Sequence, residues 1–364
     1  MTIQFKSKKV FLYCSLLLVC FFTSLSKADE GVLLQERAIA EQVLNKKQAT
    51  TIMPEDVAVV VNEQDANSVL VGDYYLNARN IPRTNLIIVS ITPNTKELTE
   101  KQFSPLREKI YAQLPVNIQV IVLMWTTPYA VSCNSITSAI TMGYEPKFCA
   151  NGCATGVKNP YFNSLSSNPS LDFNMRLSML LPTDSVELAK SIIDKGVLSK
   201  FKTKEATAYF LKTKDKQRSM PRERFFPKDM TRIDSNKLYL RTLSAEDIRD
   251  KKDIMFYFTG AKFVNGLESL NFMPGAIADH LTSRGGVLNN KSQMSSLKWL
   301  EAGATGSYGS VSEPCNYWQK FPNPQVLLTH YLQGQTLIEA YWKSVYWPAQ
   351  GLFLGEPLAA PYQN

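Results

Sequence analysis

Runs of apolar, largely β-branched residues alternate with helical patterns along this chain, and this alternation limits its possible folds more than any other feature. Such runs are typical of strands buried on both faces of a sheet, and the first part of the chain has them at residues 57–62, 86–91 and 118–125. Helical periods separate them, one from Asn67 or Ser68 to about residue 78, the next near residues 100–114. Because parallel neighbours need crossover connections, the pattern predicts an α/β fold with a mostly parallel, doubly wound sheet.

The same alternation continues in the second part of the chain. Residues 276–281 and 304–308 fit a strand or a helix, because glycine and alanine occur in both. No internal repeat is visible in the sequence. We predict a single α/β domain over residues 54–364, with a cysteine-rich loop at 130–170 and a helical or flexible lead-in at 29–53. Further strands are predicted at residues 177–181, 206–211 and 254–258, and helices at 185–198 and at 326–346 with a break at Gly334.

The amino terminus has the parts of a signal peptide. Lys6, Lys8 and Lys9 form a positive segment, an apolar core follows at residues 10–22, and Ser26-Lys27-Ala28 provides the small residues of a cleavage site. The core is short for a membrane span, which needs about 20 residues. We expect residues 1–28 to be removed after Ala28, which would leave a periplasmic or secreted protein without a transmembrane span. An uncleaved anchor is the alternative.

The net charge argues against a nucleic-acid partner. The formal charge of the precursor is +8, and the four lysines of residues 1–28 account for half of it. The mature chain therefore keeps an ordinary charge for its size. The remaining positive charge is concentrated between residues 200 and 228. A solvated connector explains this cluster, and a surface for an anionic ligand is the alternative.

The cysteines fit an exported protein. Without residues 1–28 the chain keeps Cys133, Cys149, Cys153 and Cys315. The first three lie in a stretch rich in Asn, Gly, Ser and Thr, where a disulfide would hold a loose loop. We predict one disulfide among these three. The remaining cysteine and Cys315 are then either bonded to each other or free, because the sequence alone cannot choose a pairing.

Standard cofactor and metal motifs are missing from the sequence. It contains neither GxxxxGKS/T nor GxGxxG for nucleotide phosphates, and neither HExxH nor GxSxG. His280 and His330 are its only histidines, so a three-histidine metal site is impossible. We therefore expect neither a cofactor nor a metal.

Several motifs resemble a family of bacterial proteins that carry signal peptides. The resemblance covers nearly all of the mature chain. It implies export but no particular reaction, because the family has no established activity to carry over. The motifs are VVVN at residues 59–62, NPYF at 159–162, PGAIADHLTS at 274–283, GATG at 303–306, EPCN at 313–316 and GEPL at 355–358.

A more distant resemblance is to the catalytic half of gingipain-type cysteine peptidases, which have the caspase-like fold. It rests on the order of the predicted strands at 254–258, 276–281 and 303–309 and on the terminal LGEP at 354–357. The resemblance implies a histidine after the first of these strands and a nucleophilic cysteine after the second. Gly260-Ala261 and Thr282-Ser283 occupy those places here, so the usual dyad is missing.

The candidate site residues lie in loops at predicted strand ends, where open α/β sheets bind ligands. His280 is the candidate base or ligand anchor, and Cys315 is the candidate thiol, because an imidazole can take a proton from a thiol at neutral pH. Glu313 could orient the imidazole. The alternative is structural, with Cys315 in a disulfide and His280 bonded to a loop carbonyl. The binding residues expected to converge with these are Thr127, Tyr129, Arg284 as an anion contact, and Trp318.

Two classes of function fit these observations. The missing dyad favours a non-catalytic envelope protein that binds a peptide, a glycan or another envelope protein on a caspase-like scaffold. The alternative is a cysteine-type hydrolase of the cell envelope that uses His280 and Cys315. A free thiol of Cys315 close to His280 would favour the hydrolase, whereas a disulfide at Cys315 would remove it.

Overall fold

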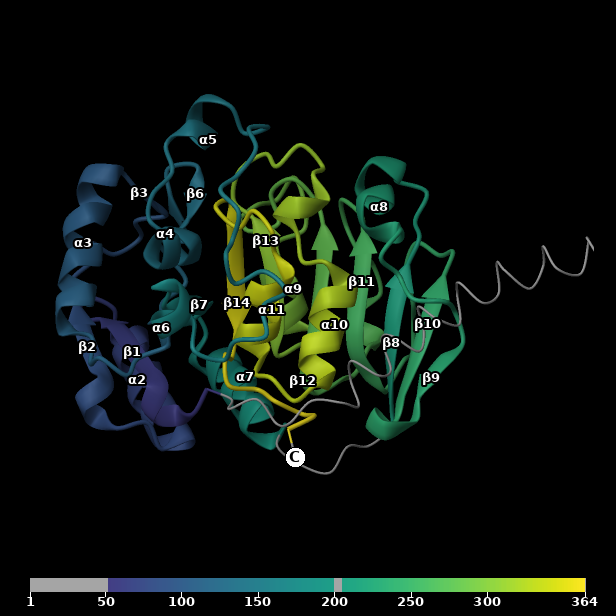
Figure 1. Cartoon of the computed structure of the whole chain (residues 1–364), viewed down its shortest axis with the longest axis horizontal. Helices are drawn as coiled ribbons and strands as arrows, with labels where there is room; N and C mark the ends of the chain where they lie inside the picture. The colour runs from purple at the N-terminus through teal and green to yellow at the C-terminus, as the bar shows by residue number, and fades with distance from the viewer. Residues whose placement is uncertain (1–51, 200–204, 364) are drawn as a thin grey trace, which may run out of the picture. The chain divides into compact units, whose positions relative to one another are not determined.

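Eleven strands form the central sheet of this computed structural model, which describes residues 52–199 and 205–363 (Figure 1). A second sheet has three short strands in the order β3-β5-β6. The predicted α/β fold with a mostly parallel sheet is confirmed. In their order across the central sheet, the strands are β2 Leu86–Val89, β1 Val57–Asn62, β4 Val120–Met124, β7 Leu177–Leu181, β14 Gly351–Gly355, β13 Gly306–Ser310, β12 Phe272–Leu281, β11 Ile254–Gly260, β8 Ala206–Leu211, β10 Leu238–Leu243 and β9 Thr231–Ile233.

The central sheet consists of two parallel sets that run in opposite directions. Strands β2, β1, β4, β7 and β14 are parallel to one another, and so are β13, β12, β11, β8 and β10. The two sets meet at β13 and β14, which pair antiparallel from Gly306 opposite Gly355 to Ser310 opposite Gly351. The carboxyl ends of the strands in one set therefore lie beside the amino ends of the strands in the other set.

The two parallel sets repeat one topology that the sequence does not reveal. In chain order the first set runs β1, β2, β4, β7 and stands as β2-β1-β4-β7, and the second runs β8, β10, β11, β12 and stands as β10-β8-β11-β12. The hydrogen bonds that connect the end of the first strand of each set to the following helix repeat as well. The backbone N–H of Asn62 donates to the hydroxyl of Ser68, and that of Thr213 donates to the hydroxyl of Ser219, each six residues further along. The chain thus contains a structural duplication.

Helices cover both faces of the sheet. Alternate residues of β1 belong to two separate apolar clusters, as expected of a strand buried on both faces. One cluster includes residues of α2, α10 and α11, and Figure 1 shows α10 and α11 in front of the sheet. The other includes residues of α3, α4 and α9. The α-helices are α2 Ala66–Arg79, α3 Glu100–Gln113, α4 Ile136–Met142, α5 Lys147–Ala150, α6 Pro169–Phe173, α7 Val186–Leu198, α8 Lys216–Glu223, α9 Leu297–Glu301, α10 Pro324–Leu332 and α11 Leu337–Ser344.

Local side-chain chemistry explains where the predicted boundaries shift. Strand β2 ends at Val89, before the predicted residue 91, because the side chain of Asn62 bonds both the backbone N–H and the carbonyl of Ile91. Helix α2 is capped by Asp65, which precedes the predicted caps, because the hydroxyl of Ser68 is already engaged by the end of β1. Helix α7 is capped by Ser185. The predicted helix at 326–346 is divided into α10 and α11 near Gly334, whose φ is +88°.

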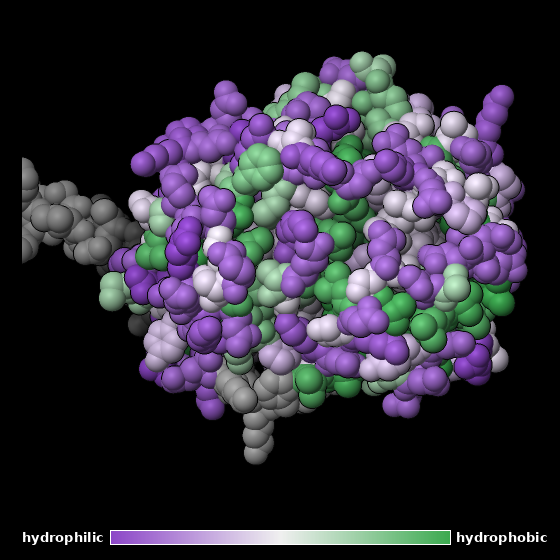
Figure 2. All heavy atoms as spheres, turned by 180° about the vertical axis from the view of Figure 1, so that it is seen from behind, coloured by the Kyte–Doolittle hydropathy of each residue, from purple (hydrophilic) through white to green (hydrophobic). Residues whose placement is uncertain are grey.

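The stretch at 130–170 contains more regular structure than the predicted loop. It holds β5 Ala130–Val131, β6 Asn134–Ser135, α4 and α5, and β5 pairs with β3 Glu97–Leu98. Strands β14, β10 and β9 were also not predicted. The predicted signal peptide and almost all of the lead-in at 29–53 lie outside the described residues. Figure 2 shows the opposite face of the molecule, where hydrophilic side chains predominate and hydrophobic ones lie between them.

Candidate ligand-binding site

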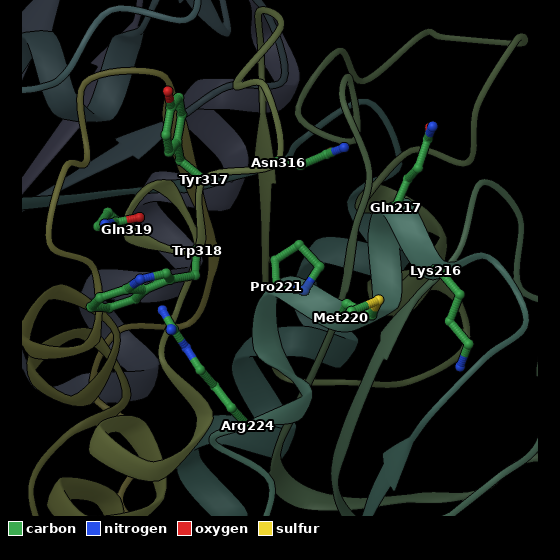
Figure 3. A pocket seen from close by; sticks show the side chains of 9 residues that line it. All are labelled: Lys216, Gln217, Met220, Pro221, Arg224, Asn316, Tyr317, Trp318 and Gln319. Atoms are coloured by element: carbon green, nitrogen blue, oxygen red, sulfur yellow. The ribbon is translucent and has the colours of Figure 1, made fainter.

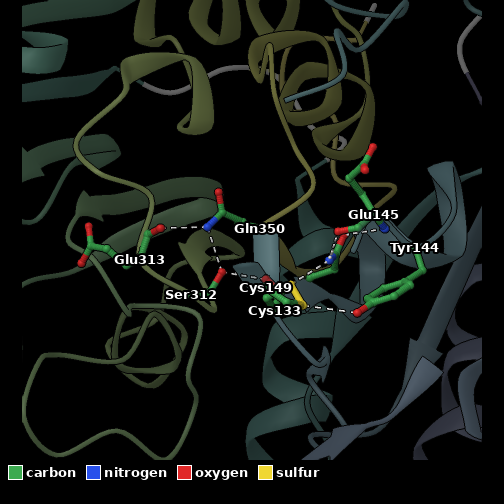
Figure 4. The surroundings of a disulfide bond; sticks show 8 residues. Cys133, Tyr144, Glu145, Cys149, Ser312, Glu313 and Gln350 are labelled. Carbon is green, nitrogen blue, oxygen red and sulfur yellow. Dashed lines mark hydrogen bonds between the residues drawn. A yellow bond between two sulfur atoms is a disulfide. The ribbon is translucent and has the colours of Figure 1, made fainter. Parts of the chain in front are cut away.

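Two disulfides connect the cysteine-rich stretch to itself and to the loop after β13. We call Cys133–Cys149 the short bridge and Cys153–Cys315 the long bridge, because their sequence separations are 16 and 162. The predicted disulfide among the first three cysteines is confirmed, and Cys315 bonds the remaining one. Around the short bridge, the hydroxyl of Ser312 donates to the carbonyl of Cys133 at 2.6 Å (Figure 4). The loop after β13 is therefore fixed to this stretch by covalent and hydrogen bonds.

His280 has a structural environment inside the core. It lies on β12, and its Nε2 donates to the carbonyl of Met294 at 3.0 Å, while its Nδ1 accepts from the indole N–H of Trp299 at 2.9 Å. Burial lowers the pKa of His280 to about 3, despite the opposing hydrogen bond to Met294, and the positive charges of Arg222 and Arg218 lower it further. The imidazole is therefore neutral at physiological pH and both of its nitrogens are occupied.

Asp279 points to the other face of the sheet, as strand geometry requires of a neighbour of His280. Its Oδ1 lies 2.5 Å from Nη1 of Arg222, and both side chains are buried. Arg222 also donates to the carbonyl of Thr259 at 2.7 Å. This ion pair connects α8 to the middle of the second parallel set. Asp279 is therefore not available to orient His280.

Cys315 and Glu313 shape a turn instead of forming a catalytic pair with His280. The sulfur of Cys315 is bonded to Cys153, so this residue has no thiol with which to attack a substrate. The Glu313 carboxylate accepts from the backbone N–H of Cys315 at 2.8 Å. Both Cys315 and Asn316 have a φ of +57°, a left-handed conformation that costs non-glycine residues about 1–2 kcal/mol each. The imidazole–thiol pair considered from the sequence is not assembled.

Tyr129 and Arg284 do lie in one neighbourhood, whereas Thr127 contributes backbone geometry. The hydroxyl of Tyr129 donates to Asn289 at 3.2 Å. Burial raises the pKa of Tyr129, Glu97 raises it further, and the positive charge of Arg284 opposes both. Thr127 is half-buried and precedes Pro128 in a cis peptide bond. Tyr129 and Arg284 therefore come together, although the strands that precede them, β4 and β12, belong to opposite sets.

A cluster of polar side chains lies at the carboxyl ends of β8, β11 and β12. Arg218 donates through Nε to the hydroxyl of Thr282 at 3.2 Å and pairs with Asp215 at 2.7 Å. The Thr282 hydroxyl donates to Gln293 at 3.0 Å. A Cβ at Gly260 would overlap the carbonyl of Arg218, so the start of α8 packs directly on the end of β11. Sequence reasoning missed Arg218 and Gln293 as site residues.

A cleft of about 490 Å³ lies between α8 and the residues that follow Cys315 (Figure 3). Residues 316–319 form one wall, which includes Trp318. The guanidinium of Arg224 lies 5.4 Å from the centre of the Trp318 ring and 4.8 Å from that of Phe225. We call this space the α8 cleft. Its other wall consists of Lys216, Gln217, Met220, Pro221 and Arg224.

A second cleft, of about 980 Å³, lies between the loops after β11 and β12. Phe263, Leu288 and Gln293 line it, together with both acidic and basic side chains such as Glu268 and Lys291. This second cleft adjoins the segment whose Met294 carbonyl bonds His280. Of the residues that sequence analysis placed in one site, Trp318 lines the α8 cleft and none lines the second cleft.

Comparison with known protein families, curated proteins and solved structures finds no match to this chain. Within residues 52–199 and 205–363, no helix is long and apolar enough to cross a membrane. The same residues contain no group of three or more His, Cys, Asp and Glu side chains placed to hold a metal ion.

Proposed function

We propose that this protein is an exported, non-catalytic binding protein of the cell envelope and that its ligand occupies the α8 cleft. The observation that carries this proposal is the construction of the 316–319 wall. Two successive left-handed residues stand at the start of this wall, Cys315 directly before it and Asn316 as its first residue. Such strain persists where surrounding contacts over-determine it, and it gathers at ligand-binding positions.

Several independent contacts hold that wall in place. The long bridge fixes Cys315, and the side chain of Gln350 donates to the carbonyl of Glu313 at 2.9 Å. The buried ammonium of Lys320 donates to the carbonyl of Gly152 at 2.6 Å. Burial lowers the pKa of Lys320 to about 8, although Glu313 opposes this. A wall fixed before binding loses little conformational entropy when a ligand arrives, which favours affinity.

We further propose a caspase/gingipain-like scaffold. The strand order β10-β8-β11-β12 and the sequence motifs after β12 and β14 support it. At the two places where such peptidases carry their dyad, this chain has Gly260 and Thr282. With His280 neutral in the core and all four described cysteines in disulfides, the described residues offer no His/Cys dyad, and this supports binding over cysteine-type catalysis. Two disulfides support export to an oxidising compartment.

The experiment is a binding screen with the mature, oxidised protein. Acidic oligosaccharides, neutral oligosaccharides and peptides are titrated against the wild type, Trp318→Ala and Phe263→Ala. Phe263 is the matched control, because it is an aromatic residue with 48 % exposure that lines the second cleft. We expect Trp318→Ala to weaken binding about tenfold or more, the loss of one buried aromatic contact, and Phe263→Ala to leave it unchanged. Binding that depends on Phe263 and not on Trp318 would refute the assignment.

A further inference from the structure

Resting on the proposed binding function, we infer that the ligand of the α8 cleft is an acidic glycan, a chain of sugar rings that carry carboxylates. Three features of the cleft carry this inference: its charge, its unpaired amide and its aromatic surface. Each of them corresponds to one chemical group of such a ligand.

The charge of the cleft favours an anion. The nine described residues that line it include Lys216 and Arg224 but no aspartate or glutamate. The nearest acids already have partners. Glu223 accepts from the hydroxyl of Ser219 and lies 3.9 Å from the ammonium of Lys216, and Asp215, the cap of α8, pairs with Arg218. Arg224 is exposed and takes part in none of the ion pairs found between described residues. Its guanidinium can therefore bind a carboxylate through two N–H groups.

The amides of the cleft favour a ligand with hydroxyl groups. Gln319 lines the cleft, and its buried Oε1 atom accepts no hydrogen bond within the described structure. An unsatisfied buried acceptor costs about 1–3 kcal/mol, and a donor on the ligand would remove this cost. Gln217 and Asn316 add further amides at the same cleft. A carboxylate has no donor, so the charged group alone does not account for Gln319. Sugar hydroxyls do.

The aromatic residues extend the binding surface beyond the cleft. Tyr317 is 39 % exposed, and its ring centre lies 5.9 Å from that of Trp347. Trp347 in turn lies 5.8 Å from Tyr346, whose ring has the ammonium of Lys158 at 5.6 Å. The faces of aromatic rings are electron-rich and attract the C–H groups of a sugar ring. A row of rings with a cation at each end, Arg224 beside Trp318 and Lys158 beside Tyr346, suits a polymer that presents both C–H faces and carboxylates.

An acidic peptide fits less well. Extended peptides gain affinity by adding a strand to an exposed sheet edge, and every residue that lines the cleft belongs to α8, to its carboxyl-terminal cap or to the segment 316–319. No strand of the described structure presents its backbone there. The glycan is therefore the occupant that the side chains favour.

The test uses isothermal titration of the mature protein with three uronate tetrasaccharides that differ in linkage: oligogalacturonate, oligomannuronate and a hyaluronan fragment. The methyl ester of each removes the charge and keeps the sugar skeleton. We expect at least one uronate to bind, with its ester about tenfold weaker or more and with affinity that falls as salt rises. Arg224→Ala should remove this preference, whereas Arg249→Ala, an exposed arginine of the second cleft, should preserve it.

The outcomes separate this inference from the proposed function. Equal affinity for uronate and ester would overturn the acidic part while a Trp318-dependent site remained. Trp318-dependent binding of peptides without binding of any uronate would overturn the glycan and keep the binding protein. If every ligand found binds Trp318→Ala as tightly as the wild type, the α8 cleft is not the binding site, and the proposed function is refuted with it.

Discussion

Acidification should destabilise this protein through His280, and the size of the effect follows from the burial of the imidazole. The pKa of His280 is lowered from its ordinary 6.5 to about 3 in the folded state. Between these values the unfolded chain binds a proton that the folded protein does not. The stabilisation that comes from this difference in pKa is therefore complete above pH 6.5 and is lost as the pH falls toward 3. Between pH 7 and pH 4.5 this single group should remove about 2.5 kcal/mol from the free energy of unfolding.

His280→Gln provides the comparison, because glutamine does not titrate and still offers a donor for Met294 and an acceptor for Trp299. Urea unfolding at pH 7.0 and 4.5 gives the free energy of unfolding for both proteins. Every other titrating group is the same in both, so the difference isolates the imidazole. The wild type should lose about 2.5 kcal/mol more than the variant on acidification. Equal losses in the two proteins would refute the neutral, buried imidazole and reopen His280 as a base.

Two further perturbations test what holds the site together. Asp279→Asn should cost about 3–5 kcal/mol in urea unfolding at pH 7, because it leaves Arg222 charged and buried without its partner, and Arg222→Met combined with Asp279→Leu should recover most of that loss; a double variant as unstable as the single one would contradict this. Replacing both cysteines of the long bridge by serine should cost about 5 kcal/mol and those of the short bridge about 3 kcal/mol, since the longer loop loses more entropy when closed. Equal costs would argue against the loop-entropy account.

The apolar runs of the sequence predict most of the strands in the central sheet. The strands β1, β7 and β8 begin and end where their apolar runs do, because strands buried on both faces need apolar side chains at every position. Strand β14 escaped prediction because it has only five residues and a glycine at each end. The duplicated topology is equally invisible in the sequence, since it depends on strand order and not on side chains.

The candidate site was harder to predict because its two walls are about one hundred residues apart in the chain. Trp318 is a candidate from the sequence because it lies beside Cys315 and another aromatic residue, whereas Lys216 and Arg224 belong to a basic run for which a solvated connector is the favoured explanation. His280 and Cys315 share one motif-rich block of the sequence, yet the fold buries one under α9 and bonds the other to Cys153. Distances across a fold do not follow distances along the chain.

Hydrogen exchange with and without the tightest-binding probe tests the central claim most directly. If the α8 cleft is the binding site, the ligand should slow exchange of backbone amides in residues 216–224 and 316–319, the two walls of the cleft. The segments 262–268 and 288–301 around the second cleft should exchange as in the free protein. Protection confined to residues 262–268 and 288–301, with residues 216–224 and 316–319 unchanged, would contradict the α8 cleft as the binding site.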